Sequence, residues 1–150
     1  MRKVKLQMQL SVDGFVAGPG GEPDWLQCSS DAGLLDYVGG ITKNVDYILT
    51  DQDLQKIGWS NGETAKENLV KEINKLKKEN GGDIIIYGGS SFLPSLIKEG
   101  LIDEYHFFVN PTAMGKGTAI FQSIGSKKNL KLISAKPFEC GVVLLFYKPE

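Results

Sequence analysis

The feature of this sequence that most constrains its fold is a short, unbroken apolar run between two helical segments. Residues 83–87 read Asp-Ile-Ile-Ile-Tyr, and a Gly-Gly pair follows at once. A run of this kind is typical of a strand that is covered on both faces, as in a parallel sheet. Parallel strands need long crossover connections, and helices are predicted at 64–78 before the run and at 90–99 after it. The run therefore predicts an α/β fold.

Further strands are predicted on both sides of this run. Polar and apolar residues alternate from Lys3 to Leu10, which predicts a half-buried strand. The other predicted elements are a short helix from Ser30 to about Val38 and strands at 45–49, 105–109, 130–134 and 141–147. Because strands alternate with helices early and follow one another late, we expect a mixed, mostly parallel sheet with antiparallel C-terminal strands. With 150 residues, a single domain spanning 1–150 is expected.

Charge and composition exclude several classes of protein. There are 17 Lys and Arg against 18 Asp and Glu, and this balance argues against nucleic acid as a partner. No apolar run approaches the roughly 18 residues that a membrane span needs, so we expect no membrane partner and a cytoplasmic location. The single histidine, His106, excludes a histidine-based metal cluster, and no metal site is predicted. Cys28 and Cys140 are too few for a disulfide framework and are expected to be packing or surface residues.

The glycine pair after the apolar run marks a candidate anion site. Residues 87–92 read Tyr-Gly-Gly-Ser-Ser-Phe, so two glycines separate a buried strand from a helix that begins with hydroxyl side chains. Glycines let a ligand approach the backbone closely, and the N–H groups of a first helical turn attract phosphate or pyrophosphate. The alternative is an ordinary strand-to-helix turn with a serine cap, and this segment alone leaves both interpretations open.

A second candidate element is the glycine-rich loop that leaves the first strand at Asp13 and returns at Asp24 and Trp25. Loops of this length are often functional, and one that ends in tryptophan can fold over a planar ligand. The alternative is a surface loop with Trp25 packed in the core. Asp31 and Asp36 near the following helix are candidates for a proton donor or a substrate anchor, with a helix cap or a solvated residue as the alternative. For His106, a hydrogen-bonded structural histidine is expected.

Taken in order along the chain, these segments resemble the dihydrofolate reductase-like superfamily. The resemblance is in particular to bacterial proteins related to the reductase (C-terminal) domain of the riboflavin-biosynthesis deaminase/reductase. The segments that carry it are Leu-Ser-Val-Asp-Gly-Phe-Val-Ala-Gly at 10–18, Asp-Trp at 24–25, Ile-Tyr-Gly-Gly-Ser-Ser-Phe at 86–92, Ile-Asp-Glu-Tyr-His at 102–106, Asn-Pro at 110–111 and Gly-Lys-Gly at 115–117.

The resemblance implies a three-layer fold, NADPH as the hydride donor and a small-molecule substrate. It places the cofactor pyrophosphate at Gly88, Gly89, Ser90, Ser91 and Phe92, the nicotinamide beside Tyr87, and its carboxamide against Val16 and Ala17. It places the substrate near Asp24 and Trp25, and it puts Asp31 or Asp36 near the acidic residue that dihydrofolate reductase uses on its substrate.

The implied activity is reduction of a pterin-like or ribosylaminopyrimidine-like substrate, and the alternative is a non-catalytic relative that binds a nucleotide or flavin. A homodimer is expected as well, with the apolar strand at 107–109 bordering the interface.

One segment departs from the family pattern. In the family, the strand that matches Val45–Leu49 continues into a Gly-Arg-x-Thr-like turn that helps hold the 2′-phosphate of the cofactor. In this chain, Leu49 and Thr50 run into residues 51–54, which resemble a later part of the pattern. Either the protein has lost part of its cofactor site near 50–51 or the sequence omits a stretch there. Arg2 is the only arginine, so the rest of the chain offers no bidentate arginine for a phosphate.

Overall fold

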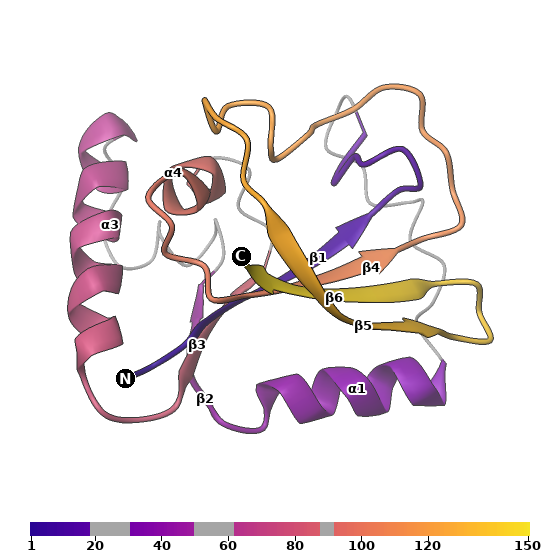
Figure 1. Cartoon of the computed structure of the whole chain (residues 1–150), viewed down its shortest axis with the longest axis horizontal. Coiled ribbons are helices and arrows are strands. Elements are labelled where there is room, and N and C mark those ends of the chain that lie inside the picture. Colours follow the sequence, from indigo (N-terminus) through magenta and orange to yellow (C-terminus); the bar gives the residue numbers. More distant parts are fainter. Residues whose placement is uncertain (19–30, 50–61, 88–91) are drawn as a thin grey trace.

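The computed structural model of the chain describes residues 1–18, 31–49, 62–87 and 92–150, with the backbone alone for 62–68. Strands and helices alternate as far as the fourth strand, and two consecutive strands follow (Figure 1). In chain order the elements are β1 (Val4–Leu10), α1 (Ala32–Thr42), β2 (Val45–Leu49), α3 (Gly62–Lys78), β3 (Asp83–Tyr87), α4 (Leu93–Lys98), β4 (Glu104–Val109), β5 (Leu130–Pro137) and β6 (Val143–Pro149). This is the order that the hydrophobic pattern predicts.

Within the described residues, the strands form one six-stranded sheet in the order β2-β3-β1-β4-β6-β5. β2, β3, β1 and β4 run parallel, whereas β6 is antiparallel to both β4 and β5. Ile84, Ile85 and Ile86 of β3 are all fully buried, as the unbroken apolar run predicts. The predicted mixed, mostly parallel sheet with antiparallel C-terminal strands is therefore confirmed.

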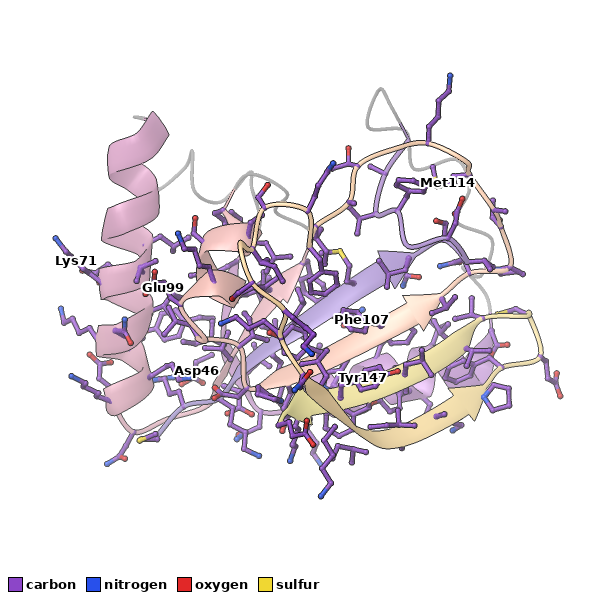
Figure 2. All side chains as sticks on the ribbon, turned by 45° about the horizontal axis from the view of Figure 1, so that its top comes forward. Asp46, Lys71, Glu99, Phe107, Met114 and Tyr147 are labelled. Atoms are coloured by element: carbon purple, nitrogen blue, oxygen red, sulfur yellow. The ribbon has the colours of Figure 1, made fainter. Side chains whose placement is uncertain are left out.

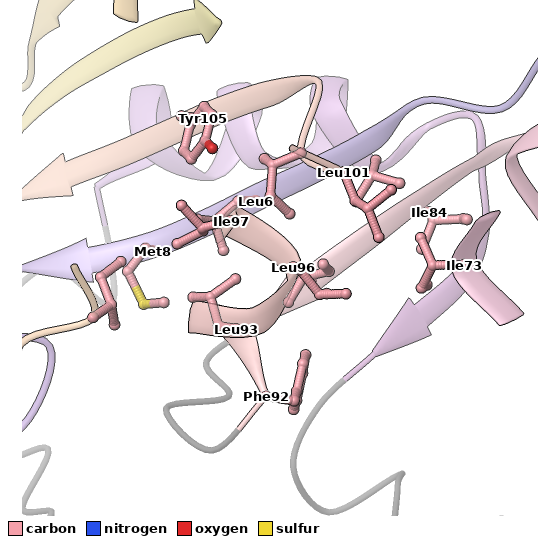
Figure 3. Packing of buried hydrophobic residues seen from close by; sticks show 14 of the residues in the cluster. Leu6, Met8, Ile73, Ile84, Phe92, Leu93, Leu96, Ile97, Leu101 and Tyr105 are labelled. Carbon is pink, nitrogen blue, oxygen red and sulfur yellow. The ribbon is translucent and has the colours of Figure 1, made fainter. Parts of the chain in front are cut away.

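β1 separates two different layers, because its side chains alternate between the faces of the sheet. Val4, Leu6 and Met8 belong to a buried cluster with residues of α3 and α4 (Figure 3). On the opposite face, the Lys5 ammonium donates a hydrogen bond to the Ile41 carbonyl of α1 at 3.2 Å. Helices thus cover both faces of the sheet, which is the three-layer arrangement that the resemblance implies.

The larger part of the core lies between the sheet and the helices α3 and α4. Ile73 of α3 and Leu96 of α4 share a cluster with Leu6 of β1 and have almost no exposed surface (Figure 3). A smaller cluster beneath α1 contains Leu34, Phe108, Phe138, Val142 and Leu144. Burial of one such side chain contributes about 1.5–3 kcal/mol, so the two clusters hold the helices on opposite faces of the sheet.

The only arginine of the chain connects segments at the amino ends of the parallel strands. Arg2 is almost fully buried, and its Nη1 donates to the Asp46 carboxylate and, at 2.7 Å, to the Gly82 carbonyl. Gly81 has a φ of +146°, and a Cβ at this position would meet the Arg2 guanidinium. Gly81 therefore makes room for Arg2, and Gly82 makes room for Asp46 and the Asn44 carbonyl, far from the carboxyl ends of the parallel strands.

Two elements are longer than the sequence predicts. α1 continues past the expected end near Val38 to Thr42, whose hydroxyl donates back to the Val38 carbonyl at 2.9 Å. β5 continues beyond the expected end at Ser134 to Pro137, through a stretch that is exposed on both faces. The hydrophobic pattern indicates neither extension, because α1 contains a pair of glycines and the end of β5 is exposed.

β4 is an inner strand, hydrogen-bonded to β1 on one side and to β6 on the other. Phe107 and Phe108 are consequently buried inside the chain, on opposite faces of the sheet. The expectation that the strand at 107–109 borders a subunit interface is therefore wrong, because its apolar side chains build the core. The homodimer itself stays a prediction.

Candidate active site

The carboxyl ends of four parallel strands meet at one edge of the sheet, which is where open α/β sheets usually bind ligands. The segment 11–18 follows β1, and the segment 110–118 follows β4. The glycine turn at 88–91 follows β3 in the sequence and lies outside the described residues. Three of the segments that carry the resemblance, those that follow β1, β3 and β4, therefore begin at the carboxyl ends of neighbouring strands.

The loop after β1 pairs with the loop after β4. The Val12 N–H donates to the Thr112 carbonyl, and the Val16 N–H donates to the Thr118 carbonyl, both at 2.9 Å. The Thr118 N–H in turn donates to the Ala17 carbonyl at 2.9 Å. Val16 and Ala17 are thus held in place by a segment that lies far away in the sequence.

Asp13 locks these two loops together. Its carboxylate accepts hydrogen bonds from the Ser11 hydroxyl at 2.6 Å, the Met114 N–H at 3.1 Å and the Gly115 N–H at 2.6 Å. These donors, the Ser11 hydroxyl foremost, lower the pKa of Asp13 to about 2. Met114 lies in the loop above the carboxyl ends of β1 and β4 (Figure 2). We call this set of contacts the Asp13 clamp.

Sequence reasoning included Asp13 in a motif but gave it no function. The local signal was present, because a Ser-x-Asp-Gly sequence after a strand is typical of a turn in which short polar side chains bind the backbone. Nothing in the local sequence indicates that Met114 binds Asp13, because the two residues are 101 positions apart. Gly115 has a φ of +76°, a conformation that favours glycine, and this is consistent with its N–H being aimed at Asp13.

A row of polar side chains from β1 lies on the sheet face that α1 covers. Gln9 Oε1 accepts a hydrogen bond at 2.8 Å from the buried amide of Asn110, the residue that follows β4. Gln7 lies in register between Tyr87 of β3 and His106 of β4. Its Oε1 is buried and has no hydrogen-bond partner among the described residues. The sequence showed these glutamines only as the polar half of an alternating strand.

His106 is a hydrogen-bonded structural histidine, as predicted. Its Nδ1 lies 2.8 Å from the Tyr37 hydroxyl and its Nε2 lies 3.4 Å from Glu104 Oε2. Its ring stacks on Phe146 with a centroid distance of 4.4 Å. Burial lowers the pKa of His106, and burial also raises the pKa of Tyr37 to about 12, so both rings are neutral at pH 7.

Asp31 caps α1. Its Oδ1 accepts from the Leu34 N–H at 3.0 Å and its Oδ2 from the Cys140 N–H at 3.1 Å. The hydrogen bond from Leu34, followed by that from Cys140, lowers the pKa of Asp31, which favours the ionised carboxylate. This geometry fits the helix-cap interpretation better than that of a proton donor. Asp36 lies on the exposed side of α1.

The remaining predicted site residues are only partly described. Asp24, Trp25 and the turn at 88–91 lie outside the described residues. Tyr87 ends β3 with its side chain half-buried, and burial raises the pKa of its hydroxyl. The Phe92 side chain is 1% exposed and packs in the core, so any contact from Phe92 to a ligand would come from its backbone (Figure 3).

Cys140 corrects one expectation. It belongs to a disulfide, whereas a packing or surface cysteine was expected. The other cysteine of the chain, Cys28, lies outside the described residues. Two cysteines form no recognisable spacing motif, so sequence alone could not have indicated the bond.

Neither a metal centre nor a membrane-spanning helix is found among the described residues. None of them form a group of three or more His, Cys, Asp or Glu side chains that could hold a metal ion. No helix in the described part of the chain is long and apolar enough to cross a membrane. A cavity of about 320 Å³ lies at the amino edge, but its lysines are paired: Lys77 with Asp103 at 2.8 Å and Lys3 with Glu104 at 3.2 Å.

Comparison with known proteins assigns the chain to a family. The model of the RibD C-terminal domain matches residues 48–144. The uncharacterized protein YyaP of Bacillus subtilis (strain 168) is 30% identical over 177 residues, which cover 97% of this chain and 94% of that protein.

Solved structures share the fold at lower identity. A pyrimidine reductase-like protein from Corynebacterium diphtheriae has a TM-score of 0.66 at 14% identity, with 99% of this chain and 92% of that chain covered. The dihydrofolate reductase of Enterococcus faecalis, complexed with NADP(H), has a TM-score of 0.62 at 14% identity, with 99% and 96% covered. The resemblance read from the sequence is confirmed, and the chain belongs to the RibD C-terminal domain family.

Proposed function

We propose that this protein is an NADPH-dependent reductase that transfers a hydride to a heteroaromatic substrate of the pterin or ribosylaminopyrimidine class. One observation carries the proposal: the Asp13 clamp joins the loops after β1 and β4 at the edge where the turn after β3 also begins. The family is of the reductase type, and two of its structural relatives are named as a pyrimidine reductase-like protein and a dihydrofolate reductase.

The described residues fit the nicotinamide end of this cofactor. Pairing with Thr118 uses the Val16 N–H and the Ala17 carbonyl, so the peptide unit between these two residues takes no part in that pairing. This peptide unit leaves the Val16 carbonyl and the Ala17 N–H, which point to opposite sides of the chain because the peptide is trans, and a carboxamide has the donor for the one and the acceptor for the other. Val16 and Ala17 can therefore hold the carboxamide through their backbone.

The phosphate end of the cofactor is constrained by the position of the only arginine. Arg2 is committed to Asp46 and to backbone carbonyls at the amino edge of the sheet. Recognition of a 2′-phosphate would then depend on lysine side chains or backbone N–H groups. The match with YyaP extends over 177 aligned positions, 27 more than this chain has residues, so the alignment contains gaps in this chain, as expected if residues have been lost or omitted.

The protein supplies position and a neutral surface for the reaction, whereas the bound cofactor supplies the hydride. The Asp13 clamp fixes the loop that carries Val16 and Ala17. Next to this loop, the polar side chains of Lys5, Gln7 and Gln9 line the sheet face that α1 covers. Asp31 and Asp36 remain the proposed acidic residues. Asp31 makes helix-cap hydrogen bonds, whereas Asp36 makes no such contacts in the described structure.

A titration of the purified protein with NADPH and NADH tests the proposal. Trp25 is predicted to border the site, so saturable quenching of tryptophan fluorescence with energy transfer to the nicotinamide is expected. Intact mass is measured on the same sample, because a mass above 16.4 kDa would show that the chain contains residues missing from this sequence. Absence of binding at a mass of 16.4 kDa would overturn the reductase proposal.

A further inference from the structure

The sheet face beneath α1 carries a buried acceptor that the protein leaves without a partner. Gln7 Oε1 is shielded from solvent and accepts no hydrogen bond within the described part of the chain. Buried polar atoms in proteins are almost always satisfied, and an exception indicates a missing water, a bound ligand or a functional group. The location of Gln7 in the sheet distinguishes among these three explanations.

Gln7 lies in the middle of the row, and its neighbours on β1 are both engaged. Toward the amino edge, Lys5 pairs with Asp83 at 2.9 Å and also binds the Ile41 carbonyl. Toward the carboxyl edge, Gln9 Oε1 is held by Asn110 at 2.8 Å. Among these side chains of β1, the Gln7 carbonyl is therefore the acceptor that the described residues leave unfilled.

The side chains that flank Gln7 in the sheet are uncharged, whereas the charged Lys5, Asp83 and Glu104 lie toward the amino ends of the strands. The flanking side chains in the sheet are Tyr87 and His106, and Tyr37 of α1 binds His106. Burial keeps His106 uncharged at pH 7, and it raises the pKa values of both tyrosines. A charged group placed between the flanking rings would lose hydration, and Lys5 and Glu104 are already engaged with Asp83 and His106, whereas a neutral N–H donor would gain a hydrogen bond.

We propose that Gln7 Oε1 accepts a hydrogen bond from a ring N–H of the substrate, and that Gln7 thereby selects a neutral, planar heterocycle of the lactam type. A lactam presents an N–H beside a C=O, and the glutamine carboxamide presents the complementary acceptor and donor. This inference rests on the proposed function, because it assumes that the reductase substrate lies at the carboxyl edge of the sheet.

A pair of ligands that differ only at the ring nitrogens tests this hydrogen bond. Lumazine carries lactam N–H groups, and its N,N-dimethyl derivative lacks them. Binding of each is measured by calorimetry in slightly acidic buffer, where lumazine is uncharged, with and without saturating NADPH. The wild-type protein is expected to bind lumazine about tenfold more tightly than the dimethyl derivative, as one hydrogen bond predicts.

Two variants identify the residue responsible. Gln7→Leu is expected to reduce the tenfold preference to about one, and its melting temperature should not fall because an unsatisfied buried acceptor is removed. Gln122→Leu makes the same chemical change at an exposed loop position and should keep the full preference. Equal binding of both ligands to the wild type, binding of neither, or an unchanged preference in Gln7→Leu would each overturn the proposal. NADPH titrated alone reports separately on the reductase proposal.

Discussion

At the scale of single residues, the described part of the site depends on side chains whose partners are distant in the sequence. Asp13 has three donors although its carboxylate is at the surface, and two of these donors belong to the loop after β4. The clamp places an anion where backbone N–H groups converge, so removing the charge weakens every one of these bonds at once.

Asp13→Asn is therefore expected to loosen the loop that carries Val16 and Ala17. The KM for NADPH should rise several-fold, while kcat with saturating cofactor changes less, because positioning and not chemistry is affected. Steady-state kinetics measures this split. Glu99→Gln, at an exposed position near the opposite edge, is the control and should leave both constants unchanged. Equal losses in kcat for both variants would contradict a positioning function for Asp13.

His106 makes stability depend on pH. Burial lowers its pKa below the usual 6.5, so the unfolded chain binds a proton at a pH where the folded chain does not. The free energy of unfolding should then fall as the pH drops below about 6.5. His106 is the only histidine, so urea unfolding at pH 7.5 and pH 5.5 reads this single group. In His106→Asn the loss between these two pH values should disappear; a persistent loss would assign it to carboxylates instead.

At the scale of elements, the strongest stabilising contacts lie between the sheet and the helices α3 and α4. Leu96 of α4 is fully buried, whereas Leu132 of β5 is 50% exposed. Leu96→Ala should reduce the free energy of unfolding by about 2–5 kcal/mol, because it leaves a cavity in the core. Leu132→Ala makes the same change at the surface and should cost less than about 0.5 kcal/mol. Urea unfolding of both variants checks the difference, and similar losses would contradict the core assignment.

Elements were predictable from the sequence where local pattern decides them. The bounds of β3 were predicted correctly, because a buried run begins at Asp83 and ends at the glycine pair after Tyr87. β5 was predicted too short, since an edge strand exposed on both faces has no apolar period. The Asp13 clamp and the unsatisfied Gln7 could not be predicted at all, because both depend on which distant segments the sheet brings together.

At the scale of the whole molecule, the two edge strands of the described sheet, β2 and β5, both present apolar side chains to solvent. β5 presents Leu132 and Ile133 to solvent, and β2 presents Ile48. A strand with apolar side chains and a free edge is a natural site for association with a second copy. We propose that the expected homodimer forms through β5 and not through the buried β4.

Sedimentation at micromolar concentration checks this proposal. The wild-type protein should sediment at twice 16.4 kDa. Ile133→Lys should shift it to the monomer, since a charge would be buried in the interface. Ile48→Lys makes the same change on β2, where the side chain is 55% exposed, and should leave the dimer intact. A monomeric wild type, or dimers in both variants, would exclude an interface at β5.

The central position of β1 has a consequence for how the chain acquires its structure. β1 pairs with β3 and β4, so Val4 meets Ile84 and Lys5 meets Glu104. During synthesis on a ribosome, β1 emerges long before either neighbour exists, and it has no strand to pair with until β3 has been made and gains its second neighbour only with β4. Pairing between strands so far apart in the sequence slows folding, and it leaves an intermediate whose exposed apolar surface promotes aggregation. The nascent chain should therefore depend on chaperones more than its small size suggests.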